Sequence, residues 1–155
     1  MQGPEGRPAT GPTAAGFLAA ALEIAERCAV DQLPAIEQAA VLVAESLFAG
    51  HRFWAFGTGH SHMMVEEIWG RAGGLSDVSP VLEPGLMLHE GLRKSSLLER
   101  QPGLARTLLE IHPVEAGDCV LVASNSGRNA VPVEFASGAR GRGATVIALT
   151  SLAHS

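Results

Sequence analysis

The chain has 155 residues, of which 46% are hydrophobic and 17% are charged, and its formal net charge is −5. This length and apolar content are typical of a single globular domain with a buried core, and they exclude a largely disordered protein. The acidic balance and the scattered Lys and Arg residues exclude a nucleic-acid-binding surface, so an anionic ligand must be held by local groups such as backbone amides or helix N-termini.

The N-terminal segment has no apolar periodicity. Residues 1–12, MQGPEGRPATGP, combine Pro, Gly and polar residues, which predicts a disordered tail before a domain that spans residues 13–155. The apolar stretch that follows is interrupted by Glu23, Glu26 and Arg27, so it is neither a membrane span nor a signal sequence. The sequence therefore predicts a cytoplasmic location and no membrane partner.

Two helices are predicted next. From Thr13, a plausible N-cap, apolar residues recur at helical spacing, and after a break at Pro34 the same spacing returns between Ile36 and Leu47. Gly50 ends the second helix, as glycine commonly does. We expect the two helices to pack as a hairpin.

After Gly50 the pattern changes to short apolar runs that alternate with helical segments. Residues 53–56 run into a glycine loop and a predicted helix over 61–72, residues 119–123 run into a second loop and a helix over 131–140, and residues 145–149 form a further strand. Residues 78–82 are a shorter strand candidate. Because parallel neighbours need crossover helices, this alternation predicts an α/β three-layer sandwich, Rossmann-like, with a parallel sheet flanked by helices.

Two loops at strand ends carry the groups suited to an anion. The first loop, residues 57–61 (GTGHS), and the second loop, residues 124–129 (SNSGRN), combine glycines with hydroxyl side chains just before helix N-termini. Either loop alone is also explained by turn geometry and helix capping, but two at equivalent points favour phosphate binding. The predicted phosphate ligands are Gly59, Ser61, Ser124, Asn125, Ser126, Gly127, Arg128, Asn129, Thr150 and Ser151.

At these residues the chain resembles the sugar isomerase (SIS) family, whose second loop has the form S-x-S-G-x-[ST] and binds the phosphate of phosphosugars. The last position here is Asn129, an amide where a hydroxyl is usual. The loops G-[AT]-G-H-S and S-x-S-G-R-N are similar to those of a bacterial subgroup of phosphosugar-binding proteins and phosphoheptose isomerases, related to N-acetylglucosamine-6-phosphate dehydratase and N-acetylmuramic acid 6-phosphate etherase. The resemblance runs from about Phe17 to the chain end. It implies a phosphorylated sugar as ligand and a homo-oligomer, a dimer or a tetramer, with pockets at the subunit interface.

The chain departs from that family in two places. Members of this kind continue for a further strand and a C-terminal helix, so we expect the domain to be truncated at its C-terminus. Phosphoheptose isomerases and the etherases also place a catalytic Glu ten positions beyond the serine of the first loop, where this chain has Arg71.

The candidate catalysts are carboxylates and a histidine, because proton abstraction next to C1 of a sugar needs a base and an acid. Glu83 follows a strand candidate on the expected ligand side and is the first choice. His60 lies inside the first loop, where a sugar contact and a capping role are both open. Glu66 and Glu67 reach the pocket only if their helix face allows it, and a solvated face is the alternative. We expect no metal and no organic cofactor, since His60-x-His62 is too local to specify a metal site.

The sequence as a whole favours an isomerase or a dehydratase/lyase that acts on a sugar phosphate, such as a hexosamine 6-phosphate or a heptose 7-phosphate. The alternative is a non-catalytic phosphosugar sensor, which the Arg at position 71 favours. A nucleotide-binding domain is a remote third reading, because the first loop lacks the third glycine of G-x-G-x-x-G and no P-loop is present.

Overall fold

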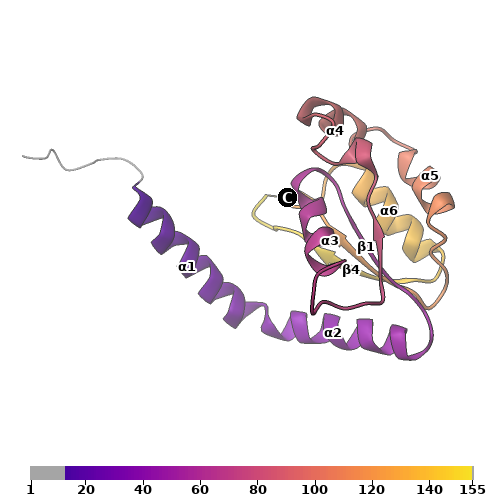
Figure 1. Ribbon diagram of the computed structural model, residues 1–155, viewed down its shortest axis with the longest axis horizontal. Helices are drawn as coiled ribbons and strands as arrows, with labels where there is room; N and C mark the ends of the chain where they lie inside the picture. Colours follow the sequence, from indigo (N-terminus) through magenta and orange to yellow (C-terminus); the bar gives the residue numbers. More distant parts are fainter. Residues whose placement is uncertain (1–12, 155) are drawn as a thin grey trace, which may run out of the picture. The chain divides into compact units, whose positions relative to one another are not determined.

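A computed structural model describes residues 13–154, so the predicted tail over residues 1–12 lies outside the described residues. The chain divides into two compact units, one ending at Ala39 and the other beginning at Ala40. The elements, in chain order, are α1 (Ala14–Asp31), α2 (Leu33–Phe48), β1 (Phe53–Gly57), η1 (Gly59–Ser61), α3 (His62–Ile68), β2 (Val78–Val81), η2 (Pro84–Leu86), α4 (Leu92–Leu98), α5 (Leu104–Ile111), β3 (Cys119–Ala123), α6 (Ala130–Gly141) and β4 (Thr145–Leu149) (Figure 1).

The two predicted N-terminal helices are present, but the predicted hairpin between them is not formed. Thr13 caps α1 as expected, since its hydroxyl accepts a hydrogen bond from the Gly16 amide at 3.0 Å. Only Gln32 separates α1 from α2, and its backbone is helical with its N–H bonded to the Cys28 carbonyl. Antiparallel helices are joined by loops of about 2–5 residues, so one helical residue does not reverse the chain. Within residues 13–154, no helix is both long enough and apolar enough to cross a membrane.

The sheet has four parallel strands in the order β2-β1-β3-β4, which confirms the predicted α/β fold. The register sets Gly57 at the end of β1 opposite Ala123 at the end of β3, and Ala123 opposite Leu149 at the end of β4. The segments that follow these three strands therefore leave from the same edge of the sheet.

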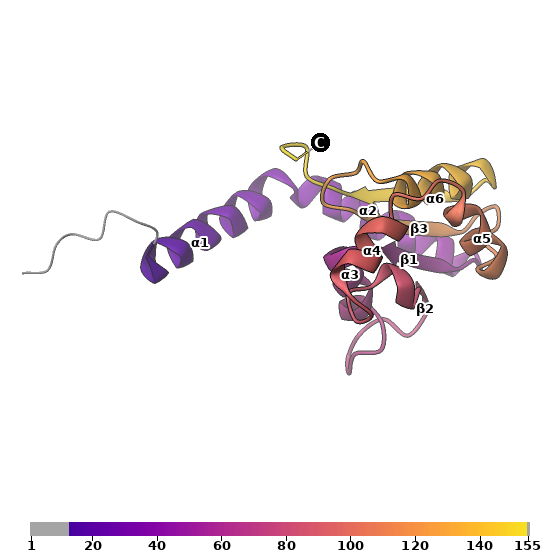
Figure 2. The same ribbon diagram turned by 90° about the horizontal axis from the view of Figure 1, so that it is seen from above.

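The second unit buries both faces of the sheet. Phe53 and Ala55 of β1 pack with Val65 of α3 on one face, together with side chains from the C-terminal part of α2. Trp54 and Phe56 point to the other face, where α5 and α6 cover the strands (Figure 2). Each fully buried large apolar side chain contributes about 1.5–3 kcal/mol, so this two-sided core holds the strand ends in fixed positions.

Three helical segments differ from the expectation. α3 ends at Ile68 rather than near residue 72, because Gly70 and Gly73 adopt positive φ angles of 72° and 76° that end helical geometry. Between β2 and β3 lie α4 and α5, which no pattern above predicts. α5 buries Ala105, Leu108 and Leu109 at helical spacing, so its sequence does carry the signal of an amphipathic helix.

Candidate functional site

The first loop turns sharply at the end of β1. A Cβ atom on Gly57 would lie 2.5 Å from the carbonyl oxygen of Ser61, so only glycine fits where the chain folds back on itself. Gly59 has a positive φ of 54°, and the Ser61 amide donates to the Thr58 carbonyl at 3.0 Å. This tight turn brings Ser61 to the start of α3, directly above the end of the sheet.

The second loop is folded around its own serine. The hydroxyl oxygen of Ser124 accepts a hydrogen bond from the Gly127 amide at 3.2 Å, and Gly127 has a positive φ of 61°. A Cβ atom on Gly127 would lie 3.0 Å from Thr150 Oγ1, so this glycine also allows close approach to the end of β4. Asn129 occupies the N-cap position of α6 with an extended backbone and no capping bond from its side chain.

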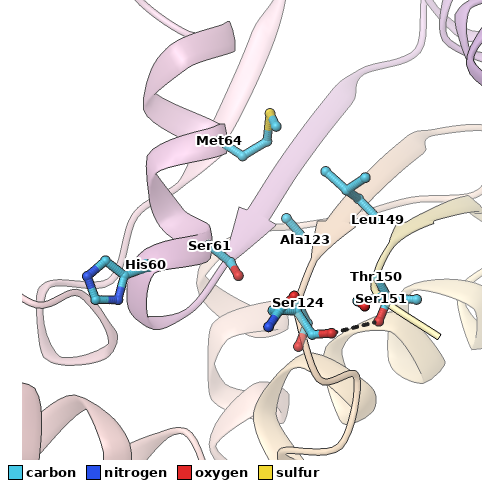
Figure 3. Close-up of a pocket in the computed structure, with 9 residues that line it drawn as sticks. His60, Ser61, Met64, Ala123, Ser124, Leu149, Thr150 and Ser151 are labelled. Carbon is cyan, nitrogen blue, oxygen red and sulfur yellow. Dashed lines mark hydrogen bonds between the residues drawn. The ribbon is translucent and has the colours of Figure 1, made fainter. Parts of the chain in front are cut away.

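The residues after β4 are tied to the second loop. The Ser151 amide donates to the Asn125 carbonyl at 3.1 Å, and the Thr150 hydroxyl donates to the same oxygen at 3.4 Å, the dashed line of Figure 3. The Ser124 amide in turn donates to the carbonyl of Leu149 at 2.9 Å. These hydrogen bonds join the segments that follow β3 and β4 into one rim at the carboxyl edge of the sheet, where ligands of open α/β sheets bind.

Two adjoining pockets open at this rim and share His60, Ser61, Ser124 and Asn125. The first, which we call the Thr150 pocket, has a volume of about 390 Å³ and is lined by His60, Ser61, Met64, Ala123, Ser124, Asn125, Leu149, Thr150 and Ser151. Figure 3 shows its hydroxyl residues gathered at the strand ends, with Met64 and Leu149 beside them. The second, the Glu99 pocket, has a volume of about 330 Å³ and is lined by Thr58, Gly59, His60, Ser61, Leu88, Leu92, Ser95, Ser96, Glu99, Ser124, Asn125, Ser126 and Asn129.

Most of the predicted phosphate ligands come together at these pockets. The lining residues include Gly59, Ser61, Ser124, Asn125, Ser126, Asn129, Thr150 and Ser151. Gly127 and Arg128 line neither pocket. Gly127 shapes the loop through its backbone, whereas Arg128 is exposed to solvent.

The three predicted catalysts lie in different places. His60 is exposed and lines both pockets. Glu83 lines neither, and its carboxylate instead accepts from the Gly85 amide at 3.3 Å, which caps η2. Glu67 is paired with Arg71 and lies in a separate hollow beside Phe53, the first residue of β1 and thus at the opposite edge of the sheet. The structure brings only His60 to the loops.

A carboxylate that the sequence patterns did not indicate does border the site. Glu99 follows α4, is partly buried, and accepts a hydrogen bond from the Thr58 hydroxyl of the first loop at 2.8 Å. Its backbone carbonyl accepts from the Val131 amide in α6, the helix that follows the second loop, at 3.0 Å. Glu99 is therefore hydrogen-bonded both to the first loop and to the helix after the second. No motif marks Glu99, because it is brought to the rim by α4 from a segment without a predicted element.

The arrangement offers hydroxyls and a helix N-terminus, groups suited to an anion, with a carboxylate and an imidazole at its border. The fold of the chain is similar to that of phosphoheptose isomerase GmhA from Neisseria gonorrhoeae, with a TM-score of 0.70 at 20% sequence identity over 91% of this chain and 74% of that chain.

Close relatives are found at the sequence level. The chain is 52% identical over 124 residues to UPF0309 protein BH3325 of Halalkalibacterium halodurans. The matched residues make up 80% of this chain and 51% of that protein. The chain is 48% identical over 126 residues to UPF0309 protein BOV_A0853 of Brucella ovis, covering 81% and 52%. The chain thus spans about half the length of the curated relatives it matches. The family model described as the SIS domain matches residues 16–151, and the chain therefore belongs to the SIS domain family.

Proposed function

We propose that the chain binds a phosphorylated sugar, with the phosphate at the second loop and the sugar extending into the Glu99 pocket. The observation that carries this proposal is the shared lining of the two pockets, since Ser61 and Ser124 lie on the wall that both have in common. A dianion there is stabilised by hydroxyl donors and by the N-terminal end of α6. The net charge of −5 offers no general attraction for an anion, so these local donors supply the binding energy.

The proposed reaction is isomerisation, or elimination of the dehydratase/lyase type, by proton abstraction next to C1. In the isomerisation of an aldose, a base removes the proton from C2 and the C1 carbonyl oxygen takes up a proton, which gives an enediol; C1 then takes up a proton while the C2 hydroxyl loses its own, which gives the ketose. Glu99 is the carboxylate best placed to be that base, because it lines the pocket while Thr58 fixes its orientation. His60, in the same pocket, is placed to move a proton at the sugar oxygens.

The test compares two glutamates. Glu99→Gln keeps the size of the side chain and removes the base, so we expect turnover to fall roughly a hundredfold or more while phosphosugar affinity stays within a few-fold. Glu83→Gln is the matched control, and we expect it to keep turnover, because Glu83 caps η2 and lines neither pocket. A hexosamine 6-phosphate and a heptose 7-phosphate are assayed by deuterium exchange at C2 and by calorimetry. The reverse ranking would return Glu83 to the role of base.

The non-catalytic sensor is the second candidate, favoured by Arg71 at the position where related isomerases carry a glutamate. Arg71 is exposed and paired with Glu67, away from the loops. Under this alternative, calorimetry detects phosphosugar binding, yet no exchange occurs at C2 in the native chain. Binding without exchange would therefore replace the enzyme by the sensor, and the absence of binding would contradict both.

We also propose that the protein forms a homo-oligomer, with pockets completed by the neighbouring subunit. α1 has no buried residue, and its large apolar side chains retain most of their exposure, among them Phe17 at 72%, Leu22 at 65% and Val30 at 75%. An apolar surface of this kind is typical of an interface. Light scattering at micromolar concentration should give at least a dimer, and a Phe17→Glu/Leu22→Glu variant should reduce the measured mass.

A further inference from the structure

Three side chains with metal-binding atoms meet beside the first loop. His62 begins α3, Glu66 lies one helical turn later, and His89 comes from the segment between η2 and α4. One ligand atom from each lies within 4.8 Å of the others. The rings of His62 and His89 meet edge to face, with centroids 5.2 Å apart.

The imidazole of His62 is fixed in the orientation that a metal ligand needs. Its Nδ1 contacts the carbonyl oxygen of Gly59 in the first loop. A carbonyl oxygen only accepts hydrogen bonds, so Nδ1 carries a proton, and the tautomer with its single proton at Nδ1 presents a lone pair at Nε2. Ring orientation by a backbone carbonyl is the usual support of a metal-binding histidine.

The Nε2 atom of His62 has no partner for that lone pair. His62 is only 2% exposed, and Nε2 is buried without a hydrogen bond. The nearest carboxylate oxygen, Oε2 of Glu66, is 3.7 Å away, too far for a hydrogen bond, and the carboxylate has no proton to offer. A buried acceptor that faces an anion is unfavourable unless a cation lies between them.

We propose that His62, Glu66 and His89 bind a divalent transition-metal ion of the Zn²⁺ class. Two imidazoles and one carboxylate are a known ligand set of zinc enzymes, and they leave a coordination position open. Zn²⁺ lies about 2.0–2.2 Å from nitrogen and oxygen ligands, so two ligands of one ion are at most about 4.3 Å apart. The three donor atoms are already within 4.8 Å of one another. His89 is exposed and the Glu66 side chain is 42% exposed, so both side chains have room to rotate and close the remaining gap.

The site adjoins the proposed sugar pocket without depending on it. Ser61 precedes His62 and Leu88 precedes His89, and both Ser61 and Leu88 line the Glu99 pocket. The proposed metal site therefore borders the Glu99 pocket, although none of its three ligands lines that pocket. The proposal departs from the sequence-based expectation of no metal, which considered the spacing His60-x-His62. Glu66 lies four positions after His62, but His89 is distant in the chain and reaches the pair only in the folded structure.

Calorimetric titration of the chelator-stripped chain with Zn²⁺ tests the proposal directly. We expect one Zn²⁺ per chain, a rise in melting temperature, and no competition from excess Mg²⁺, which prefers oxygen ligands. His89→Ala should weaken Zn²⁺ binding about a hundredfold or more, since loss of even an outer-shell partner costs about 10–100-fold. His89 is exposed, so this variant avoids the folding risk of replacing the buried His62.

Matched controls separate this site from incidental binding to surface histidines and carboxylates. His51→Ala removes another exposed histidine, and Glu67→Gln removes the glutamate beside Glu66, so both should leave Zn²⁺ affinity unchanged, whereas Glu66→Gln should weaken it at least about tenfold. Circular dichroism checks that each variant is folded. Failure of the native chain to bind Zn²⁺, or equal weakening in the control variants, would overturn the proposal. Because no sugar is present in these titrations, their outcome is independent of the phosphosugar assays.

Discussion

The two ends of the central strands carry polar groups that are used in opposite ways. At the amino end of β3, Asp118 is 3% exposed, and its carboxylate accepts from the Arg52 amide at 2.9 Å, the Trp54 indole N–H at 2.8 Å and the Glu115 amide at 2.9 Å. At the carboxyl end, six positions further along, Ser124 begins a loop whose residues line two pockets. The first cluster is satisfied from within the fold, whereas the second faces the space where a ligand binds.

This difference separates stability from function. Buried polar groups with complete internal partners hold the structure together, and their loss leaves donors unsatisfied. Polar groups at an open rim have water as a partner, so they contribute less to folding and remain available to a ligand. Each end can therefore be damaged without the other, and variants at the two ends should give opposite phenotypes.

The largest effect is expected from Asp118→Ala. The change leaves three donors without their acceptor, among them the buried indole N–H of Trp54, so the free energy of unfolding should fall by about 3–5 kcal/mol. Urea unfolding followed by circular dichroism measures it, with Ser124→Ala as the control at the other end of the strand, expected within about 1 kcal/mol of the native chain. Equal losses in the two variants would erase the distinction.

The sequence was informative about the carboxyl end and silent about the amino end. Apolar runs followed by Gly-Ser loops predict strands and their ligand edge, because both signals are local. Asp118 carries no such signal, since its partners Arg52 and Trp54 are more than sixty positions away in the chain and only the parallel pairing of β1 with β3 brings them together. Glu99 was missed for the same reason. The N-terminal hairpin was predicted wrongly because periodicity indicates helices but not whether the chain reverses between them, and Gln32 keeps a helical backbone.

The second prediction concerns the rim. Replacing both Ser124 and Ser126 by Ala should weaken phosphosugar binding by about 2–4 kcal/mol, since hydrogen bonds to charged groups contribute about 1.5–3 kcal/mol each. Calorimetry with a hexosamine 6-phosphate measures the affinity, and urea unfolding should show a nearly native stability. Unchanged affinity in the double variant would refute the phosphate assignment.

A third and smaller effect is a dependence of stability on pH that comes from the amino end. Burial alone raises the pKa of the Asp118 carboxyl, but hydrogen bonds from Arg52, Glu115 and Trp54 and the charge of Arg52 outweigh it, so the pKa lies below its ordinary value of 3.8. A lowered folded-state pKa gives stability that is present above the unfolded-state value near 3.8 and is lost as the pH falls through the folded-state value.

Unfolding free energies measured from pH 6 to pH 2 should therefore fall on acidification. Asp118→Asn should start from a lower stability and show a shallower fall, because it has no carboxyl to protonate. An identical slope in the two proteins would assign the acid sensitivity to other carboxylates.

The smallest effect is expected at Arg128, the one positively charged residue predicted for the phosphate. Arg128 is exposed and lines neither pocket, so its charge acts on a bound dianion through solvent. Exposed charge pairs contribute about 1 kcal/mol or less and are screened by salt, so Arg128→Ala should weaken phosphosugar binding about fivefold or less, and the difference should shrink between 0.05 M and 0.5 M NaCl. A Ser126→Ala variant titrated at both salt concentrations is the control, because a hydroxyl in the pocket wall should keep its effect. A loss at Arg128 of a hundredfold that persists in high salt would mean that the guanidinium folds onto the phosphate when the ligand binds. The carboxyl end would then bind its ligand with a closing loop rather than with the preformed rim that the hydrogen bonds among Ser124, Asn125 and Ser151 describe.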